Sequence, residues 1–564
     1  MHPIIVSETV HPAGESKIAL ASAVESELVI DTPGGRYRAS FDDRTPVSAL
    51  GPLVFFAQYL QASGQFGALC RNAPLVYRSP YAPAARDVVG TVVLGILAGH
   101  WRYAHLSALR FDEVAPGLLG LSTICSEDSA RRGLRRVDQI EGAQWLRGHL
   151  RQSWWEFLST PWILDVDTTI KPLYGRQEGA AVGYNPQKPG RPSHALHTYW
   201  ISTLRLCLDV ETHPGNHSAA GYGLDGLWTL IDELPPQRRP HLVRGDCAYG
   251  HETCLLAAEK RGQAYLFKLR RSQGVTRLIT QIERERETRW QDAGQGWVGT
   301  EGSLRLQGWS LARRVVIVRR RLSQSRSPRA RRQTAKQAAN PWTHAGLEIA
   351  ACEVIDYEYQ VLVTNLTYGV ETLAPMYRAR GDAENPFDEL KNQWGWGGFT
   401  TQRLATSQQA ARLIALVYNW WTLYNRLVTP GQHHEAITSR PRLLGGVAKQ
   451  SDHAGQKRLA VRLLHADAPD LKPRIIALVG WLQDLLTSAE QLDVATRWQR
   501  IVDFGSKLWR HGAGSTNVAC SGLIAPTHRR LTDHPHAFSR RSAASGYLLT
   551  AVFRLKDPTF HPNA

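Results

Sequence analysis

The sequence predicts an α/β fold, a mixed sheet with helices on both faces, and two observations carry that prediction. First, the apolar segments between residues 160 and 270 indicate three strands, followed by helix, strand, helix and strand. Second, this order places helical connections between later strands, which then lie parallel and need covering on both faces. The segments in chain order are WILDVDT, HALHTYWIST, LCLDVET, GLWTLIDEL, HLVRGD, ETCLLAAEK and AYLFKLR.

This order of elements is typical of a ribonuclease-H-like sheet, in which the first and fourth strands are neighbours. Asp167 follows the apolar part of the first strand, and Asp246 follows the fourth. We therefore expect these two carboxylates to lie side by side, with Glu384 added by a later helix. The gap between Asp246 and Glu384 is longer than one connection needs, so we expect an inserted subdomain there.

The whole chain divides into five predicted regions: an N-terminal region 1–150, the first part of the ribonuclease-H-like domain 151–270, an inserted β-rich subdomain 271–368, the second part of that domain 369–430, and a helical C-terminal region 431–564 with a loosely ordered tail. Residues 1–45 alternate like strands, and residues 46–150 have apolar residues at helical spacing. Ser126 is the predicted N-cap of a basic helix carrying Arg131 and Arg135. That helix either follows a phosphate backbone or is a solvated charged face.

The inserted region is predicted to be β-like, with an Arg-rich loop expected to be flexible because it has no core-forming residues. We expect Trp290, Trp297 and Trp309 to pack in its core. The helix ARLIALVYNWWTLYNRLV should pack back on the sheet, and RIIALVGWLQDLL belongs to further helices. The predicted strands are GSLRLQGWSL, RRVVIVRRRL, LEIAACEVI and YEYQVLVTNL, and the loop is SQSRSPRARRQTAKQAA.

Composition favours a polyanionic partner, because 67 Lys and Arg residues face 50 Asp and Glu residues, a formal charge of +17. No basic start followed by an apolar stretch opens the chain, and the most apolar segment, 88–99, is too short to cross a bilayer. These features predict a soluble, cytoplasmic, nucleoid-associated protein without a membrane partner. Seven scattered cysteines do not suggest a disulfide scaffold. Cys247, His251 and Cys254 lack the spacing of a zinc knuckle, so we interpret the thiols as reduced and mostly buried.

The segment YRARGDAENPFDELK places Tyr377, Arg380, Glu384 and Lys391 at offsets of three, seven and fourteen residues. On one continuous helix these offsets bring the four side chains within roughly 60° of each other. A carboxylate among phosphate-seeking groups suits metal-dependent chemistry on a nucleic-acid backbone. Pro386 opposes a continuous helix. The alternative is a new helix capped by Asn385 with Pro386 in its first turn, and Lys391 would then leave the shared face.

Each acidic residue also has a structural interpretation. A single aspartate at a strand end is more often a cap than a metal ligand. The Tyr-Arg-Glu-Lys face is equally an amphipathic surface with pairing between Arg380 and Glu384. Asp165 lies two residues before Asp167, on the same side of the strand, and competes with it as a ligand.

The three motifs together resemble the DDE transposases of bacterial insertion sequences, in the branch with a Tyr-x2-Arg-x3-Glu-x6-Lys signature. The resemblance covers roughly residues 150–430 and rests on Tyr377 to Lys391 without a gap, DVDTT around Asp167, GDCAYG around Asp246, and QEGAAVGYNPQKPGRPSHALH between them. The family motif has Thr directly after the catalytic aspartate, which favours Asp167 over Asp165.

The resemblance implies that Asp167, Asp246 and Glu384 are catalytic and bind two Mg²⁺ ions, with Mn²⁺ as a substitute. It implies that Tyr377, Arg380 and Lys391 grip phosphates. The N-terminal region, with Arg131 and Arg135, would recognise the inverted-repeat ends.

The implied activity is cleavage at the element's ends and strand transfer into target DNA, both double-stranded, by a homodimer. Two alternatives remain open at this stage. One is a ribonuclease-H-like DNA nuclease without strand transfer, and the other is a catalytically decayed DNA-binding derivative.

Overall fold

A computed structural model describes residues 27–185, 188–285, 287–322, 357–431, 433–488 and 492–512, with only the backbone for 219–220, 382–385 and 508–512. The chain divides into two compact units, Met1–Gly512 and Ala513–Ala564, and every described residue belongs to the first. Of the last sixty residues, which were predicted to be mostly loosely ordered, 505–512 belong to a described helix and 513–564 lie outside the described residues.

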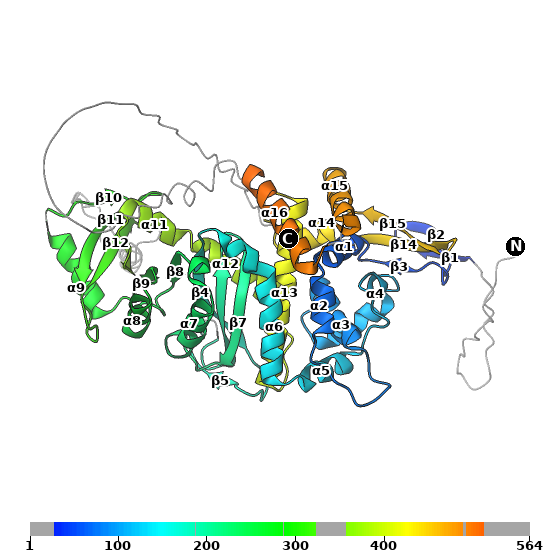
Figure 1. Ribbon diagram of the computed structural model, residues 1–564, viewed down its shortest axis with the longest axis horizontal. Coiled ribbons are helices and arrows are strands. Elements are labelled where there is room, and N and C mark those ends of the chain that lie inside the picture. Colours follow the sequence, from blue (N-terminus) through cyan, green and yellow to red (C-terminus); the bar gives the residue numbers. More distant parts are fainter. Residues whose placement is uncertain are drawn as a thin grey trace, which may run out of the picture. The chain divides into compact units, whose positions relative to one another are not determined.

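The central element is a mixed sheet whose first part has the order β7-β6-β4-β8-β9 (Figure 1). Strand β6 is antiparallel to both β4 and β7, whereas β4, β8 and β9 are parallel. The first and fourth predicted strands are thus neighbours, which is consistent with a ribonuclease-H-like sheet. Their bounds are β4 Ile163–Pro172, β5 Ala181–Val182, β6 Pro192–Ile201, β7 Leu206–Pro214, β8 Leu242–Gly245 and β9 Tyr265–Lys268, with helices α7 Leu224–Asp232 and α8 Glu252–Lys260 between them.

The inserted region extends this same sheet, because β13 pairs antiparallel with β9 and continues through β12 and β11 to β10. The bounds are β10 Gln291–Asp292, β11 Trp297–Leu304, β12 Arg313–Arg321 and β13 Tyr357–Thr364. The strand predicted within 302–311 lies earlier, at Trp297–Leu304. The segment LEIAACEVI and the Arg-rich loop lie outside the described residues.

A helix opens the insertion, which the β-like interpretation did not foresee. Helix α9, Gln273–Arg284, begins at Ser272, whose side chain accepts a hydrogen bond from the amide of Val275. Val275, Ile279 and Ile282 are buried at helical spacing, a pattern that the polar residues between them concealed.

The tryptophans of the insertion pack as expected. Trp297 and Trp309 are buried, and Trp290 is partly buried and packs against the core. The guanidinium of Arg319 lies 3.8 Å from the centroid of the Trp290 ring. Core packing therefore explains the presence of these rings.

The N-terminal region is mainly helical, as predicted, after the hairpin of β1 and β2. Ser126 caps α5, because its hydroxyl accepts from the Ser129 amide at 3.1 Å. The elements are β1 Leu28–Thr32, β2 Gly35–Ala39, β3 Val47–Ser48, α1 Leu53–Ser63, α2 Gln65–Arg71, α3 Ala85–Leu97, α4 Ala115–Leu118, α5 Glu127–Arg136 and α6 Gln139–Trp154, with 3₁₀ segments at Tyr103–Phe111 and Trp155–Ser159.

The C-terminal region was predicted to be helical, and this is wrong for residues 446–463. Strands β14, Gly446–His453, and β15, Gln456–Leu463, form a hairpin that joins β3 in a separate three-stranded sheet. This segment has few apolar residues, and their alternation with polar ones is too short to indicate strands clearly. The segments on either side have apolar residues at helical spacing, so the whole region was predicted to be helical. The helices around it are α14 Ala436–Leu443, α15 Ala468–Thr487 and α16 Val494–Gly512.

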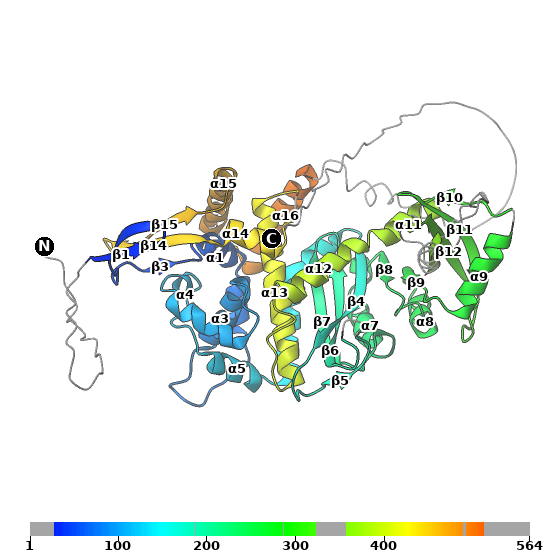
Figure 2. The same cartoon turned by 180° about the vertical axis from the view of Figure 1, so that it is seen from behind.

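Helix α13, Leu404–Val428, packs against β7 as the sequence predicted (Figure 2). Strand β7 has β6 on one side only, so its outer backbone groups need other partners. Gln408 supplies two of them, donating to the carbonyl of Val210 at 2.6 Å and accepting from the Thr212 amide. Asn419 in the same way accepts from and donates to the backbone of Cys207.

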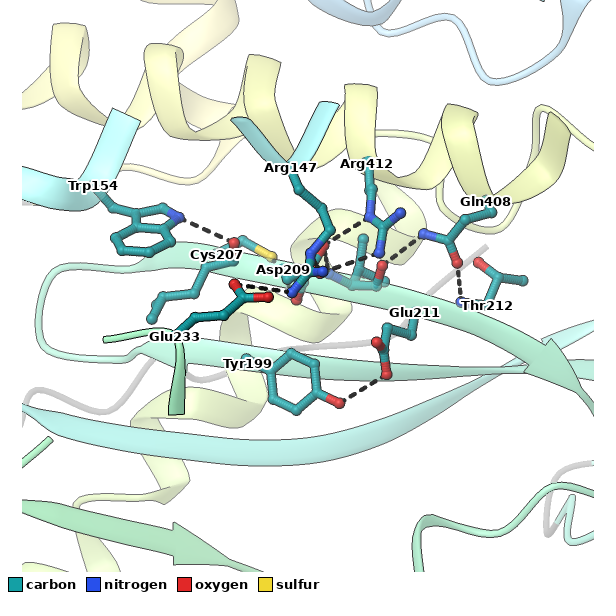
Figure 3. A network of polar contacts seen from close by, with 12 residues as sticks. Arg147, Trp154, Tyr199, Cys207, Asp209, Glu211, Thr212, Glu233, Gln408 and Arg412 are labelled. Carbon is teal, nitrogen blue, oxygen red and sulfur yellow. Dashed lines mark hydrogen bonds and ion pairs between the residues drawn. The ribbon is translucent and has the colours of Figure 1, made fainter. Parts of the chain in front are cut away.

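A buried ion pair adds to this attachment (Figure 3). The Asp209 carboxylate of β7 accepts from Arg412 of α13 at 2.8 and 3.1 Å. Arg147 of α6 approaches the same carboxylate at 3.1 Å. Two helices from distant parts of the sequence therefore fix the outer strand of the sheet that carries the site.

Candidate active site

The register of two parallel strands brings Asp167 and Asp246 together. The pairing of β4 with β8 runs from Ile163 with Leu242 to Val166 with Gly245. Asp167 and Asp246 are each the next residue after the last pair. Neighbouring strands lie about 5 Å apart, so the two carboxylates occupy adjacent positions at one edge of the pairing. This is the arrangement expected from the predicted topology.

Both carboxylates line a cleft of about 380 Å³. The Asp167 side chain is 23% exposed, and its Oδ1 accepts from the Thr168 amide at 2.7 Å. Asp246 accepts from the Ala248 amide at 2.9 Å, which turns the chain away from the strand end. The other lining residues are Cys247, Lys268, Gln360, Tyr377, Arg378, Arg380 and Gly381.

Arg380 is the direct partner of Asp167, with its Nη2 at 2.5 Å from Oδ2. Burial raises the pKa of Asp167 to about 6, and the charge of Asp246 adds to this rise while Arg380 opposes it. Burial lowers the pKa of Arg380, but Asp167 and other neighbouring groups outweigh that effect and raise it above its ordinary value. The cleft thus holds two carboxylates facing one firmly charged guanidinium.

The structure separates Asp165 from this site. Asp165 is buried and binds Arg244 through both oxygens at 2.7 Å. Arg244 lies opposite it on β8 and also donates to the Met376 carbonyl. A carboxylate that is already paired on both oxygens in the core is a poor ligand for an exchangeable metal. The competition between Asp165 and Asp167 is therefore resolved in favour of Asp167 as the cleft residue.

The expectation of one continuous helix from Tyr377 to Lys391 is wrong. Helix α11 spans Val370–Arg378, and α12 spans Gly381–Asn392. The alternative start at Asn385 is also wrong, because α12 begins before it and contains Pro386. Tyr377 and Arg380 reach the cleft because they flank the junction between two helices, rather than because they share a helical face.

Tyr377 is buried at this junction, and its hydroxyl lies 3.5 Å from the Gly245 carbonyl, next to Asp246. Burial raises its pKa well above the ordinary value, so the phenol stays a hydrogen-bond donor. Its position beside the end of β8 is compatible with donation to a ligand in the cleft.

Glu384 lies in the first half of α12, where the structure describes the backbone alone. Lys391 lies in the last turn of the same helix and does not line the cleft. The buried Glu389 anchors this helix, accepting from Trp394 Nε1 at 3.0 Å and from the Ala436 amide at 2.9 Å. The helix that carries Glu384 is therefore held from its C-terminal half.

Among the side chains that the structure describes, no group of three or more His, Cys, Asp and Glu residues is arranged to hold a metal. The third expected ligand, Glu384, is not one of those side chains. The donor chemistry of the other two fits a hard divalent cation, since Asp167 and Asp246 offer carboxylate oxygens to a common open cleft. Arg380 forms an ion pair with one of these carboxylates, that of Asp167.

Sequence reasoning missed several cleft residues. Lys268 ends β9 and Gln360 lies on β13, so they come together only because these strands pair. A second hollow of about 230 Å³ shares Cys247, Lys268 and Gln360 with the cleft and adds Arg270 and Arg271. The segment KLRR, residues 268–271 at the end of a predicted strand, was the sequence signal that could have identified these cations.

Arg131 and Arg135 lie on α5, far along the chain from the cleft motifs. Arg131 pairs with Asp128 at 2.5 Å while remaining half exposed. Arg135 is exposed in the last turn of the helix.

In the part of the chain that the structure describes, no helix has the length and apolarity to span a membrane.

Comparison with known proteins gives similarity to solved structures and a match to a family model. A piggyBac transposase in a synaptic complex with hairpin DNA aligns with a TM-score of 0.33 and 12% identity, covering 83% of this chain and 88% of that chain. No curated protein matches. The family model of the transposase DDE domain matches residues 158–420, the segment that contains Asp167, Asp246 and α12. This match supports a DDE transposase and hence a DNA-processing enzyme.

Proposed function

We propose that this chain is a DNA transposase of the insertion-sequence type, which cleaves DNA at the element's ends and joins them to a target. The observation that carries the proposal is the pair Asp167 and Asp246 on adjacent parallel strands, in a cleft bordered by Arg380 and Lys268. The match to the transposase DDE domain supports the same chemistry.

In this proposal Asp167 and Asp246 hold divalent cations, with Glu384 as a third ligand, and Mg²⁺ is the natural choice. Such cations supply activation of the attacking oxygen and charge stabilisation at phosphorus. The chain's own residues position the DNA: Arg380 neutralises a phosphate beside Asp167, and Tyr377 donates a hydrogen bond from the junction of α11 and α12.

The basic wall that continues past the cleft supports a polyanionic substrate. Arg270 and Arg271 are exposed at the hollow that adjoins the cleft through Lys268. Cations of this kind bind phosphates without reading bases, and they would hold the strand that enters the site. The proposal also assigns a phosphate contact to Lys391. It assigns recognition of the element's ends to the N-terminal region, with Arg131 and Arg135 of α5, and it includes assembly as a homodimer on the DNA.

The test incubates the protein with Mg²⁺ and a DNA that carries the terminal repeats flanking its reading frame. Joined products support a transposase, cleavage without joining supports the nuclease alternative, and a shifted but uncut complex supports a decayed derivative. Absence of any DNA binding would remove all three.

Asp167→Asn is expected to abolish cleavage while DNA binding persists, because the substitution removes a ligand charge and leaves the phosphate-binding cations. The matched control is Asp225→Asn, an exposed carboxylate on α7 that lies outside the cleft. Full cleavage by the Asp167 variant, measured on a denaturing gel, would contradict its assignment.

A further inference from the structure

The hairpin β14–β15 lies outside the segment that matches the DDE domain, and its geometry is regular. Its strands pair from Gly446 with Leu463 to His453 with Gln456. The two-residue turn has positive φ at both positions, 50° at Ala454 and 73° at Gly455. Such a turn matches the right-handed twist of the strands and keeps both in register. The hairpin is therefore an ordered ribbon with two distinct faces.

The base of the ribbon is fixed to the N-terminal part of the chain. Strand β14 pairs with β3, and the Gln450 amide donates to the Pro46 carbonyl at 2.9 Å. One face of the ribbon is partly or fully buried, through Ala448, Leu459 and Val461. Burial of this face determines which side chains point to solvent.

The opposite face is basic. Lys449, Arg458 and Arg462 are all exposed, and alternation along the strands puts them on this one face. Lys449 lies opposite Ala460, so Arg458 and Arg462 are its two diagonal neighbours, about 7–8 Å away. The other residues of this face are Val447, Ser451, His453, Gln456 and Ala460, and none of them is acidic. We call Lys449, Arg458 and Arg462 the basic face.

Protection of an exposed strand edge explains only part of the basic face. Charges on an edge strand prevent unwanted pairing, and Arg458 and Arg462 lie on the edge strand β15, but Lys449 is on the central strand of this sheet, between β15 and β3. Edge protection also works with mixed charges, as in β1–β2, where Arg36 pairs with Asp31 and Arg38 with Glu27.

Within the described residues, no ion pair joins the basic face to an acidic side chain, whereas the β1–β2 arginines are both paired. The carboxyl group of Asp42 senses the charge of Lys449. Hydrogen bonding from the Arg44 amide is the main cause that lowers the pKa of Asp42, and the charge of Lys449 adds to it. The basic face thus keeps its charge for an external partner.

We propose that the basic face of the β14–β15 ribbon binds the phosphate backbone of double-stranded DNA, as a contact outside the catalytic cleft. The inference rests on the proposed function, since DNA is the polyanion that the chain would act on. A row of separated cations on a rigid ribbon neutralises several phosphates without reading sequence.

The test measures binding of a short double-stranded DNA of arbitrary sequence by fluorescence anisotropy over a range of salt concentrations. Log affinity falls as log salt rises, and Arg458→Gln should make this fall less steep by about 0.9, the value for one lost phosphate contact. The matched control is Lys457→Gln, which removes one charge from the neighbouring position but lies on the other face, opposite Asp452. Its slope should stay unchanged, and melting temperatures should show that both variants are folded.

Equal slopes for Arg458→Gln and Lys457→Gln would overturn the ribbon contact. If both slopes are reduced, general charge matters and not the face, and if both are unchanged, Arg458 contacts no phosphate. Lys449→Gln and Arg462→Gln should repeat the Arg458 result, and unchanged slopes for them also count against it. A wild-type chain that binds no DNA at all would overturn the proposed function as well. Retained binding with equal slopes would overturn the ribbon contact alone.

Discussion

At the scale of the residue, the chemistry centres on one guanidinium and two carboxylates. Arg380 contacts Asp167 directly, and Asp246 lies beside them at the end of the neighbouring strand. In the proposed function, a divalent cation held by these carboxylates would compete with the Arg380 charge for the same oxygens. An entering phosphate would give Arg380 an alternative anion.

This competition makes a prediction for Arg380→Gln. Removing the guanidinium should strengthen Mn²⁺ binding to the DNA-free protein by roughly tenfold, since a repelling charge a few ångströms away is lost. The same change should weaken cleavage of cognate DNA, because a phosphate loses its cation. Calorimetric titration gives the first result and a cleavage assay gives the second.

Arg378→Gln is the control for this variant. Arg378 lines the same cleft but donates to the Ala293 carbonyl and has no recorded contact with Asp167 in the described structure. Unchanged or weaker Mn²⁺ binding in the Arg380 variant would show that the guanidinium and the cation do not share Asp167.

At the scale of the element, two attachments decide where functional surfaces lie. Strand β7 is fixed by side chains from α13, and the β14–β15 ribbon is fixed by residues 46–51. Gly51 donates its amide to the Gly446 carbonyl at 2.9 Å and comes close to the backbone of the ribbon. A Cβ at Gly51 would lie 2.9 Å from the amide nitrogen of Ala448 and 2.9 Å from the carbonyl carbon of Val447.

Gly51→Ala is therefore expected to destabilise the attachment of the ribbon, at a cost of about 1–3 kcal/mol for a side chain forced against fixed backbone. Chemical denaturation measures the loss, and faster hydrogen exchange at β14 amides locates it. Gly480→Ala is the control, because nothing lies within 4 Å of the Cβ it would add to α15. A Gly51 variant as stable as wild type would mean that the ribbon shifts freely.

At the scale of the whole molecule, buried histidines link stability to pH. His197 is fully buried, and burial, with the nearby charge of His213, lowers its pKa from 6.5 to about 4. The unfolded chain binds a proton near pH 6.5 that the folded chain does not bind until about pH 4. The free energy of unfolding therefore falls as pH decreases through this window, by about 3 kcal/mol for this group alone.

His197→Gln should flatten the fall in stability between pH 6.5 and pH 4, measured by urea denaturation at each pH. Asp167 acts in the opposite sense, because its pKa is raised from 3.8 to about 6 and its folded form binds the extra proton. Comparison of variant with wild type isolates the histidine, since the Asp167 contribution is common to both. Identical pH profiles would show that His197 is not titrating as its burial requires.

The sequence by itself determined the order of the main strands and helices from 160 to 270, the position of Asp246 at the end of a strand, and the N-cap at Ser126, whereas Asp167 lies within β4, which continues to Pro172. These depend on local periodicity and on short-range hydrogen bonds, which adjacent residues encode. The sequence also located the Tyr-Arg-Glu-Lys segment, but by spacing that assumed a continuous helix. Domain boundaries, the roles of Glu384 and Lys391, and end recognition by Arg131 and Arg135 stay predictions.

Only the tertiary structure decided which of these residues meet. Asp165 leaves the site because Arg244 lies opposite it on another strand, Lys268 joins the site because β9 pairs with β8, and Gln360 joins it because β13 pairs with β9. The ribbon at 446–463 is held in place because residues 46–51 pair with β14 and supply the third strand of its sheet. Contacts between residues far apart in the chain are selected by packing and charge pairing in three dimensions, which no local pattern in the sequence specifies.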